Sequence, residues 1–316
     1  MCCETESSLN VLYKDVSVQV NVNTYLDQRE FSIADIINND YRIKFCTGIS
    51  NVTYLQFATS NRNYTFCVRK RILLTLMKIK LGLSFRFLAV LFNISESASR
   101  IYFKDTCKVM SVYMKVFLKF PAKDKILQNM PKCFDNYKKC RVILDCTEIP
   151  VQKRGCLKCK IRTYSHYKKD HNVKVLIGVS PSGMLTYLSK AYGGRASDKS
   201  IFNKEGIIDL LIPGADAIMV DKGFLIEDEC KKHFIQLIRP PFLGKSRKQF
   251  SKQEAEETAS IARARIHVER LIQKLKLFAV LRNRLPWSLL PCIDDVLIII
   301  GALVNLSKPI LGNDKF

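Results

Sequence analysis

The chain has 316 residues, of which 47% are hydrophobic, enough for a substantial core in about two domains. Its 51 basic and 29 acidic residues give a net charge of +22, which indicates a polyanionic partner, with nucleic acid the first candidate. No secretory signal opens the chain, and the longest apolar run, VLIIIGALV at 296–304, is far shorter than the roughly 20 residues of a membrane span. We therefore expect an intracellular protein, free of the membrane, whose cysteines are reduced.

The charge divides the first half of the chain. Residues 1–40 carry 2 basic and 7 acidic residues, and we expect this acidic segment to be mostly irregular, with a short helix near 31–38. Residues 41–144 carry 20 basic and 4 acidic residues, and residues 41–138 have the apolar spacing of helices. The run VRKR at 68–71 fits either a nuclear import signal or a solvated helix face. The sequence thus predicts a basic all-helical region at 41–138 in a nuclear protein.

A helix-turn-helix is predicted inside this basic region, at residues 84–110. Ser84 can cap a helix that runs to Phe92, the turn NIS follows, and Ser95 can cap a second helix. Ile101, Tyr102, Cys107 and Met110 would point inward. The residues that the second helix would offer to DNA are Ser97, Ser99, Arg100 and Lys104. An ordinary helical hairpin is the alternative, because the pattern is short.

From residue 139 onward, strand and helix patterns alternate. Strands are expected at 142–149, 173–180, 184–192, 216–221 and 235–242, and helices from Ser197 and at 225–234, 251–279 and 287–306. This order predicts a mixed α/β sheet with flanking helices, preceded by the basic helical region.

Two of the expected strands run directly into an aspartate. RVILD leads to Asp145 and AIMVD to Asp221. An apolar strand is buried on both faces, so a carboxylate is best tolerated at its carboxyl end, where ligand crevices open. If the strands are neighbours, the two carboxylates converge, and a divalent cation would relieve their repulsion. Either residue could instead end its strand in a turn, but the repetition favours the metal interpretation.

A third acid is available on the long helix expected at 251–279. Glu269 has apolar neighbours that would bring it near the sheet, although an ion pair with Arg265 four residues earlier is the alternative. Asp198 in GGRASDKS could cap a helix or contact the metal ligands. Glu148 lies three residues from Asp145 and should point to the opposite face of the strand.

CLKCKIRTYSHYKKDH, at 156–171, offers two cysteines and two histidines: Cys156, Cys159, His166 and His171. They could hold zinc, but their spacing matches no standard finger, and a basic loop with incidental cysteines is the simpler interpretation. His171 could instead contact a phosphate or the surroundings of the metal.

These motifs, in this order, resemble the nuclease domain of PIF/Harbinger-type DDE transposases and of host proteins derived from them. The resemblance is carried by RVILDCTEIPV, YSHYKKDHNVKVLIGVSPSGMLTYLSKAYGGRASDKSI, VDKGFLIEDE and RARIHVERLIQKLKLFAVL. It implies an RNase H-like domain at 139–312. In that domain Asp145, Asp221 and Glu269 would be catalytic residues and ligands of Mg²⁺ or Mn²⁺.

The resemblance also implies an activity and partners. The activity would be metal-dependent cleavage of DNA phosphodiester bonds by two divalent ions, with strand transfer to follow. Phosphate contacts are expected from Lys222, Arg263, Arg265 and Arg270. Lys222 departs from the family, which more often has arginine there. A separate Myb-like DNA-binding partner and a homodimer are further expectations. The alternative is a host-recruited protein that binds DNA or another protein on this scaffold without cleaving.

Overall fold

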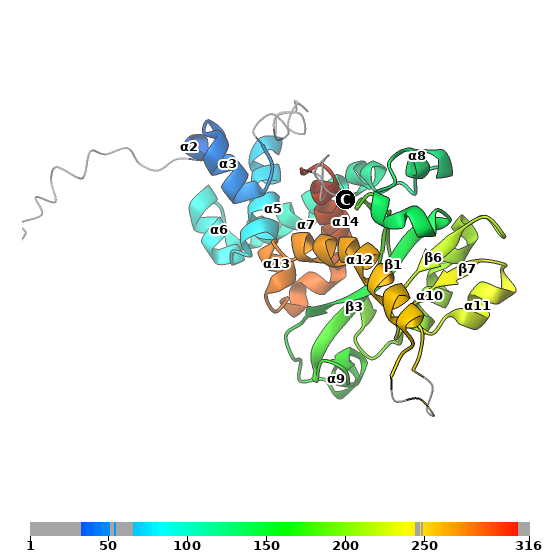
Figure 1. The fold of residues 1–316 in the computed structure, drawn as a ribbon. Coiled ribbons are helices and arrows are strands. Elements are labelled where there is room, and N and C mark those ends of the chain that lie inside the picture. The colour runs from blue at the N-terminus through cyan, green and yellow to red at the C-terminus, as the bar shows by residue number, and fades with distance from the viewer. Residues whose placement is uncertain (1–32, 51–53, 55–65, 244–246, 248, 309–316) are drawn as a thin grey trace, which may run out of the picture.

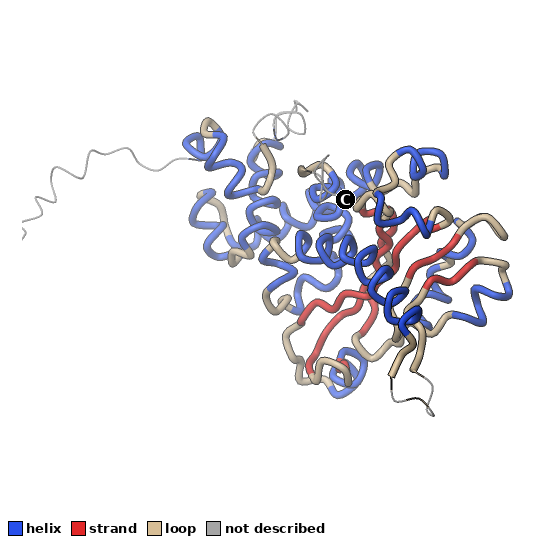
Figure 2. Tube along the Cα trace, in the orientation of Figure 1, coloured by secondary structure: helices blue, strands red, loops and turns tan. Residues whose placement is uncertain are grey.

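The structure is a computed structural model in which residues 33–50, 54, 66–243, 247 and 249–308 are described. Figure 1 shows the helices of the N-terminal half packed beside a sheet that further helices flank. Figure 2 shows the same division by secondary structure. The predicted α/β class, an RNase H-like mixed sheet preceded by an all-helical region, is confirmed. Of the predicted segment 1–40, most lies outside the described residues.

The first helices follow the sequence pattern closely. They are α2 (Ile33–Ile37), α3 (Asp40–Thr47), α5 (Val68–Leu81), α6 (Phe85–Phe92) and α7 (Glu96–Met114). Ser84 Oγ accepts a hydrogen bond from the N–H of Phe87, and Ser95 Oγ accepts one from the N–H of Ala98, so both predicted caps are present. Asn93 between them has a left-handed backbone, φ 50°, which ends α6. The helix-turn-helix geometry is therefore confirmed.

One face of α7 differs from the prediction. Phe103, Cys107 and Met110 are buried, but Ile101 is exposed, because it lies on the opposite side of the helix from Phe103 and Cys107. The segment after α7 is irregular and consists of η1 (Lys115–Phe117), α8 (Lys123–Gln128) and η2 (Lys132–Tyr137).

β1 (Cys140–Pro150) is the middle strand in the order β2-β3-β1-β6-β7. Its neighbours are β3 (Asp170–Val179), which is antiparallel to it, and β6 (Ala217–Met219), which is parallel. β7 (Gln236–Ile238) continues the parallel half. The strands β2 (Tyr164–Ser165), β4 (Leu185–Leu188) and β5 (Tyr192–Gly193) all pair with β3.

Helices cover both faces of this sheet, so β1 is buried on both sides. The remaining helical elements are α9 (Leu157–Thr163), α10 (Asp198–Glu205), η3 (Ile207–Leu210), α11 (Glu227–Lys232), α12 (Lys252–Leu275), α13 (Ala279–Arg282), η4 (Trp287–Cys292) and α14 (Ile293–Asn305). Ile143 belongs to the hydrophobic cluster that includes α12 and α14. Val142 and Leu144 belong to a second cluster with α10 and α11. The alternation along β1 therefore assigns each side chain to one of two faces.

The helical region and the sheet are joined by α14. α14 packs along α7 and also contacts β4. Ser111 Oγ of α7 donates to Asp295 Oδ1 at 2.6 Å. Asn305 donates from Nδ2 to the carbonyl oxygens of Phe117 (2.9 Å) and Leu185 (2.8 Å), and its Oδ1 accepts from the N–H of Leu185. One side chain thus links the end of the helical region, the sheet and the last helix.

The segment Trp287–Asn305 is long and apolar enough to cross a membrane by length and composition, although no uninterrupted apolar run in the sequence suggested this. In the fold, 61% of its most apolar stretch is buried by the rest of the protein, as in the core helix of a globular domain.

Candidate active site

Asp145 and Asp221 lie side by side on neighbouring strands. β1 and β6 are parallel with Ile143 opposite Met219, and each aspartate comes two residues later in the chain. Parallel neighbours are about 4.8 Å apart, and a step of two residues keeps a side chain on the same face. Both carboxyl groups therefore point to the face that α12 covers.

The two aspartates have similar local geometry. Each carboxylate accepts a hydrogen bond from the N–H of the next residue, Cys146 at 2.8 Å and Lys222 at 2.7 Å. Only Asp221 lies beyond the end of its strand. β1 continues past Asp145 to Pro150 because β3 pairs with it from Ile143 to Pro150. The prediction that both acids end their strands is therefore corrected for Asp145.

Burial raises the pKa of the Asp145 carboxyl group to about 6, from an ordinary value of 3.8. The positive charge of Arg265 and the hydrogen bond from the N–H of Cys146 act in the opposite direction, and the negative charges of Asp221 and Asp198 raise the pKa further. The surroundings of Asp145 therefore favour either its neutral, protonated form or a cation bound beside its carboxylate.

The cation nearest to this acid pair is Arg265, on α12. Its Nη1 donates to Asp221 Oδ1 at 3.0 Å, and only 12% of its side chain is exposed. Its buried Nε has no hydrogen-bond partner among the described residues. The sequence suggested that Arg265 could pair with Glu269 inside the helix, but the structure pairs it with an acid of the sheet.

Glu269 lies one helical turn beyond Arg265 and is exposed. Among the described residues no group of three or more His, Cys, Asp or Glu side chains is arranged to hold a metal ion. Carboxylate oxygens are the ligands that Mg²⁺ prefers, so the donors of Asp145 and Asp221 fit such an ion. The third ligand, Glu269, stays a prediction.

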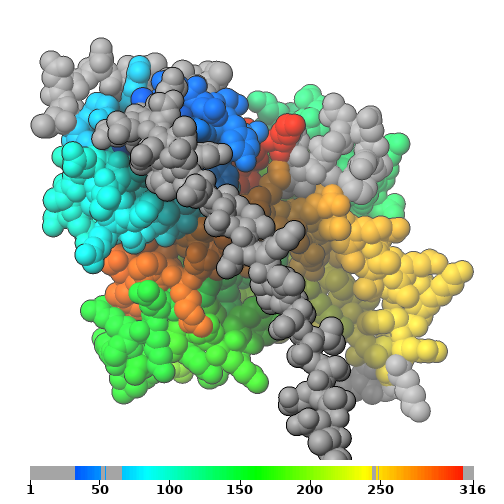
Figure 3. Space-filling view, turned by 90° about the vertical axis from the view of Figure 1, so that its left-hand side faces the viewer, coloured from blue at the N-terminus to red at the C-terminus, as the bar shows by residue number. Residues whose placement is uncertain are grey.

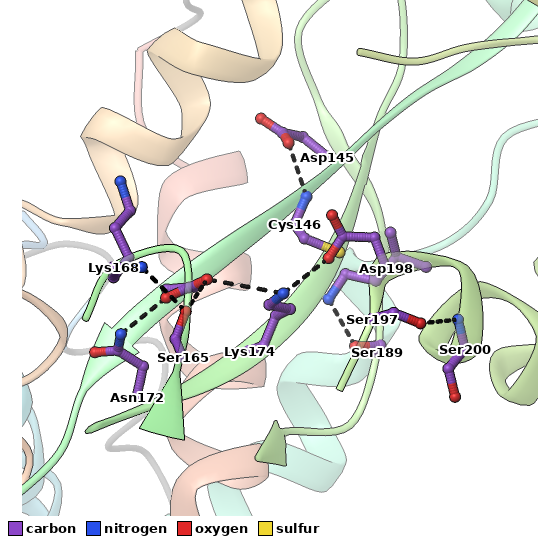
Figure 4. Close-up of polar contacts among 12 residues, drawn as sticks. Asp145, Cys146, Ser165, Lys168, Asn172, Lys174, Ser189, Ser197, Asp198 and Ser200 are labelled. Atoms are coloured by element: carbon purple, nitrogen blue, oxygen red, sulfur yellow. Dashed lines mark hydrogen bonds and ion pairs between the residues drawn. The ribbon is translucent and has the colours of Figure 1, made fainter. Parts of the chain in front are cut away.

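The other face of β1 carries a separate polar network, shown in Figure 4, where Asp145 points to the opposite side of the strand from Lys174. Glu148 accepts hydrogen bonds from Ser165 Oγ (3.1 Å) and Asn172 Nδ2 (2.8 Å), and Lys174 Nζ lies 3.7 Å from it. Lys174 also donates to Asp198 Oδ1 at 3.0 Å. Glu148 faces away from Asp145, as expected, and Asp198 belongs to this network. The helix cap at this point is Ser197, not Asp198.

The four residues of α7 that were predicted to contact DNA differ in their exposure to solvent. Ser97 and Lys104 are exposed, and Arg100 is exposed but paired with Glu96. Ser99 is fully buried, and its hydroxyl contacts the carbonyl oxygens of Phe85 and Glu96. A side chain enclosed between α6 and α7 is not available to DNA, so Ser99 is removed from that surface.

Near the acid pair, four basic residues were expected to contact phosphate. Lys222 Nζ lies over the rings of Phe242 (5.4 Å) and Phe250 (5.5 Å), which hold it beside Asp221. Arg263 is exposed and Arg270 is half-buried, both on α12. Arg265 contacts Asp221 directly.

The cysteine and histidine residues at 156–171 do not assemble a metal site, since no such group occurs among the described residues. Cys156 and Cys159 flank the first turn of α9, a helix that the sequence analysis did not predict. His171 begins β3 next to Asp170, and its Nδ1 lies 2.9 Å from Thr163 Oγ. His171 therefore lies away from the acid pair.

Comparison with known proteins agrees with this geometry. Residues 144–305 match the family described as DDE superfamily endonuclease, and residues 66–114 match the helix-turn-helix of DDE superfamily endonuclease. The first match covers the acid pair and just over half of the chain, so the chain belongs to the DDE superfamily endonucleases. No curated protein and no solved structure matches significantly.

Proposed function

We propose that this protein cleaves phosphodiester bonds in DNA, as a metal-dependent nuclease related to transposases, with Asp145, Asp221 and Glu269 as its catalytic acids. The observation that carries the proposal is the equal register of Asp145 and Asp221 on neighbouring parallel strands inside an endonuclease domain. Two carboxylates on one face, one of them with a raised pKa, form a site that favours a cation.

Asp145 and Asp221 would hold Mg²⁺ or Mn²⁺, and Glu269 would complete the ligand set from α12. Two bound ions would lower the pKa of the attacking water and stabilise the leaving 3′ oxygen. For Asp221 to bind metal fully, Arg265 must release its Oδ1. Arg265 then becomes available to a phosphate oxygen, as its unpartnered buried Nε also suggests.

DNA would lie across the basic residues of both regions. Lys104 and Ser97 on α7, and Lys222, Arg263 and Arg270 near the acids, would contact the phosphate backbone, which fixes position rather than sequence. A DNA substrate implies action in the nucleus. The freed 3′ hydroxyl would then carry out strand transfer. The proposal also includes a homodimer and a Myb-like partner that supplies further sequence recognition.

One observation favours a second candidate, a recruited protein that binds DNA without cutting it. Arg265 neutralises Asp221, and the three acids are not gathered into a metal cluster among the described residues. A scaffold that no longer cleaves would keep the basic surfaces and would tolerate this arrangement.

Nicking of supercoiled plasmid by the full chain, with Mg²⁺ or Mn²⁺ and with EDTA, separates the two candidates. We expect metal-dependent nicking that Asp221→Asn and Glu269→Gln each reduce by about 100-fold or more. Mutation even of residues that only orient metal ligands typically reduces metal affinity or activity by about 10- to 100-fold. The control is Glu256→Gln, an exposed acid of the same helix, which should nick normally. Plasmid binding without nicking in either metal would support the non-cleaving candidate.

A further inference from the structure

A surface pocket of about 410 Å³ lies beside α9 and the start of β3, away from the acid pair. It is lined by Lys160, Ile161, Tyr164, His166, His171 and Arg195. Asp145 is paired with Ile177 on β3, and His171 is six residues earlier on that strand. At about 3.3 Å per residue, the pocket lies about 20 Å along the sheet from Asp145.

Two glycines bring Arg195 to this pocket. A Cβ atom on Gly193 would lie 2.3 Å from the carbonyl oxygen of Arg162, and one on Gly194 would lie 2.7 Å from that of Thr163. Only glycine allows the segment after β5 to approach the end of α9 so closely. The N–H of Arg195 then donates to the carbonyl oxygen of Arg162. The motif GGR therefore builds one wall of the pocket.

The rings of the pocket are held by neighbouring groups. The Tyr164 ring lies edge-on to His166, with centroids 5.3 Å apart, and to His171, 5.6 Å apart. Thr163 Oγ donates to the carbonyl oxygen of Cys159, so its single hydrogen is used and it accepts from Nδ1–H of His171. This bond fixes the His171 ring and leaves Nε2 for a ligand.

The charge of the pocket is not neutralised by its lining. The six residues include no Asp or Glu, and neither Lys160 nor Arg195 forms an ion pair with any described residue. A second surface pocket, between α11 and β7, has two cations, but its Glu227 pairs with Lys231 at 2.7 Å and with Arg239 at 3.2 Å. Of these two pockets, the one beside α9 is therefore better suited to an anion.

We propose that this pocket binds one unpaired nucleotide of the DNA substrate, a proposal that rests on the proposed function. The base would lie against Tyr164 and Ile161, and its phosphate would be bound by Lys160 and Arg195, with His171 Nε2 as a further polar contact. Aromatic side chains beside cations are the usual means of binding single-stranded nucleic acid. The volume is within the range of small-ligand sites and suits one nucleotide rather than a base pair.

Figure 3 shows how the helical region and the segment around α9 lie on one face of the molecule. On the face that it shows, the helical region in blue and cyan, the segment near α13 in orange and the segment around α9 in green follow one another from top to bottom. A DNA molecule bound along the helical region can thus extend toward the pocket. The bases that reach the pocket would be those at an open end or in a melted segment.

The test uses the full chain in EDTA, so that binding is measured without cleavage. Two labelled duplexes are compared by fluorescence anisotropy, one blunt and one with a three-nucleotide overhang that carries 2-aminopurine. We expect the overhang to increase affinity and its fluorescence to be quenched by stacking. Tyr164→Leu and Arg195→Gln should each weaken overhang binding by about 5- to 100-fold, as for loss of one stacked base, and leave blunt-duplex binding unchanged.

Matched controls lie in the same segment. Tyr167→Leu removes an exposed ring three residues away, and Arg162→Gln removes an exposed cation of α9, and both variants should bind the overhang normally. Melting temperatures identify any variant that fails to fold, and overhang binding by the other of the two variants then decides.

Equal affinity of the wild-type protein for both duplexes, or equal losses in Tyr164→Leu and Tyr167→Leu, would overturn the pocket proposal. Plasmid nicking separates this result from failure of the proposed function. Nicking without overhang preference rejects only the pocket. Overhang preference without nicking rejects only the nuclease.

Discussion

Asp145 is a carboxyl group whose charged form is disfavoured by burial and by two neighbouring carboxylates. A buried acid with a raised pKa binds its proton more tightly in the folded protein than in the unfolded chain. Its contribution to stability is therefore lost as the pH rises from about 4, near the unfolded pKa, through the folded pKa of about 6. Above that pH the charged Asp145 destabilises the fold, unless a cation compensates it.

Asp145→Asn should therefore stabilise the metal-free protein at neutral pH. In EDTA at pH 7.5 we expect a gain of up to about 3 kcal/mol in the free energy of unfolding, which corresponds to a shift of about two pKa units. The gain should vanish near pH 4, where Asp145 is neutral in both states. Urea denaturation at the two pH values measures it, and a loss of stability at pH 7.5 would mean that Asp145 serves mainly as an ion-pair partner.

In the proposed nuclease, Arg265 would compete with a divalent ion for Asp221. Its guanidinium group binds Oδ1 and places a positive charge near both aspartates. Arg265→Gln should therefore tighten Mn²⁺ binding by about 5-fold, since one partly exposed charge contributes about 1 kcal/mol. Calorimetric titration of Mn²⁺ without DNA checks this, with the exposed Arg263→Gln as the control. Weaker Mn²⁺ binding in Arg265→Gln would show that the arginine organises the ligands instead.

At the scale of single elements, α7 carries a surface residue and a packing residue within two helical turns. Lys104 is exposed, whereas Ser99 is enclosed against α6. Lys104→Ala should weaken DNA binding at every sequence and reduce the log–log salt slope by about 0.9, the value for one phosphate contact. Ser99→Ala should bind DNA normally but lose about 1 kcal/mol of stability, because a buried hydrogen bond is removed. Anisotropy at several salt concentrations and urea denaturation measure the two effects.

Elements with local signals were predictable from the sequence. Ser84 and Ser95 were predicted to begin two helices because an N-cap uses only its own neighbours, and both accept the expected backbone hydrogen bonds. The strands around Asp145 and Asp221 were equally clear from their apolar runs. The family match also followed from motifs that are long and stand in the family's order.

Non-local features could not be predicted in this way. No short-range signal sets the register that brings Asp145 beside Asp221, and the strand β1 extends past Asp145 only because β3 pairs there. Helical spacing offered Glu269 as an alternative partner for Arg265, but its contact with Asp221, 44 residues distant, is not visible in a sequence. The nearest sequence signal for the pocket beside α9 was the pair Gly193–Gly194, whose close contacts lie on another element.

At the scale of the whole molecule, one hydrophobic cluster runs from the helical region to α14, on one face of the sheet. Asn305 forms hydrogen bonds with Phe117 and Leu185 across this junction. Asn305→Ala should therefore cost about 2–3 kcal/mol, because three hydrogen bonds are lost, two of them partly buried. Asn129→Ala, which removes one exposed local bond, should cost less than about 1 kcal/mol.

Urea denaturation followed by Trp287 fluorescence and by far-UV circular dichroism measures both variants. Trp287 is the single tryptophan and lies beside α14, whereas circular dichroism reports all helices. We expect the two curves to coincide, as for one cooperative unit. Separate transitions would mean that the helical region unfolds independently.

The direct packing of α7 on α14 also has a consequence for the products of cleavage. α14 contacts β4 of the sheet that carries Asp145, so continuous packing joins α7 to the acids. In the proposed nuclease, the number of base pairs between the bound sequence and the broken bond is then a constant of the fold. Each end that the protein generates would carry the same length of flanking DNA. Moving the susceptible bond by half a helical turn, about 5 base pairs, would place it on the far side of the duplex and out of reach.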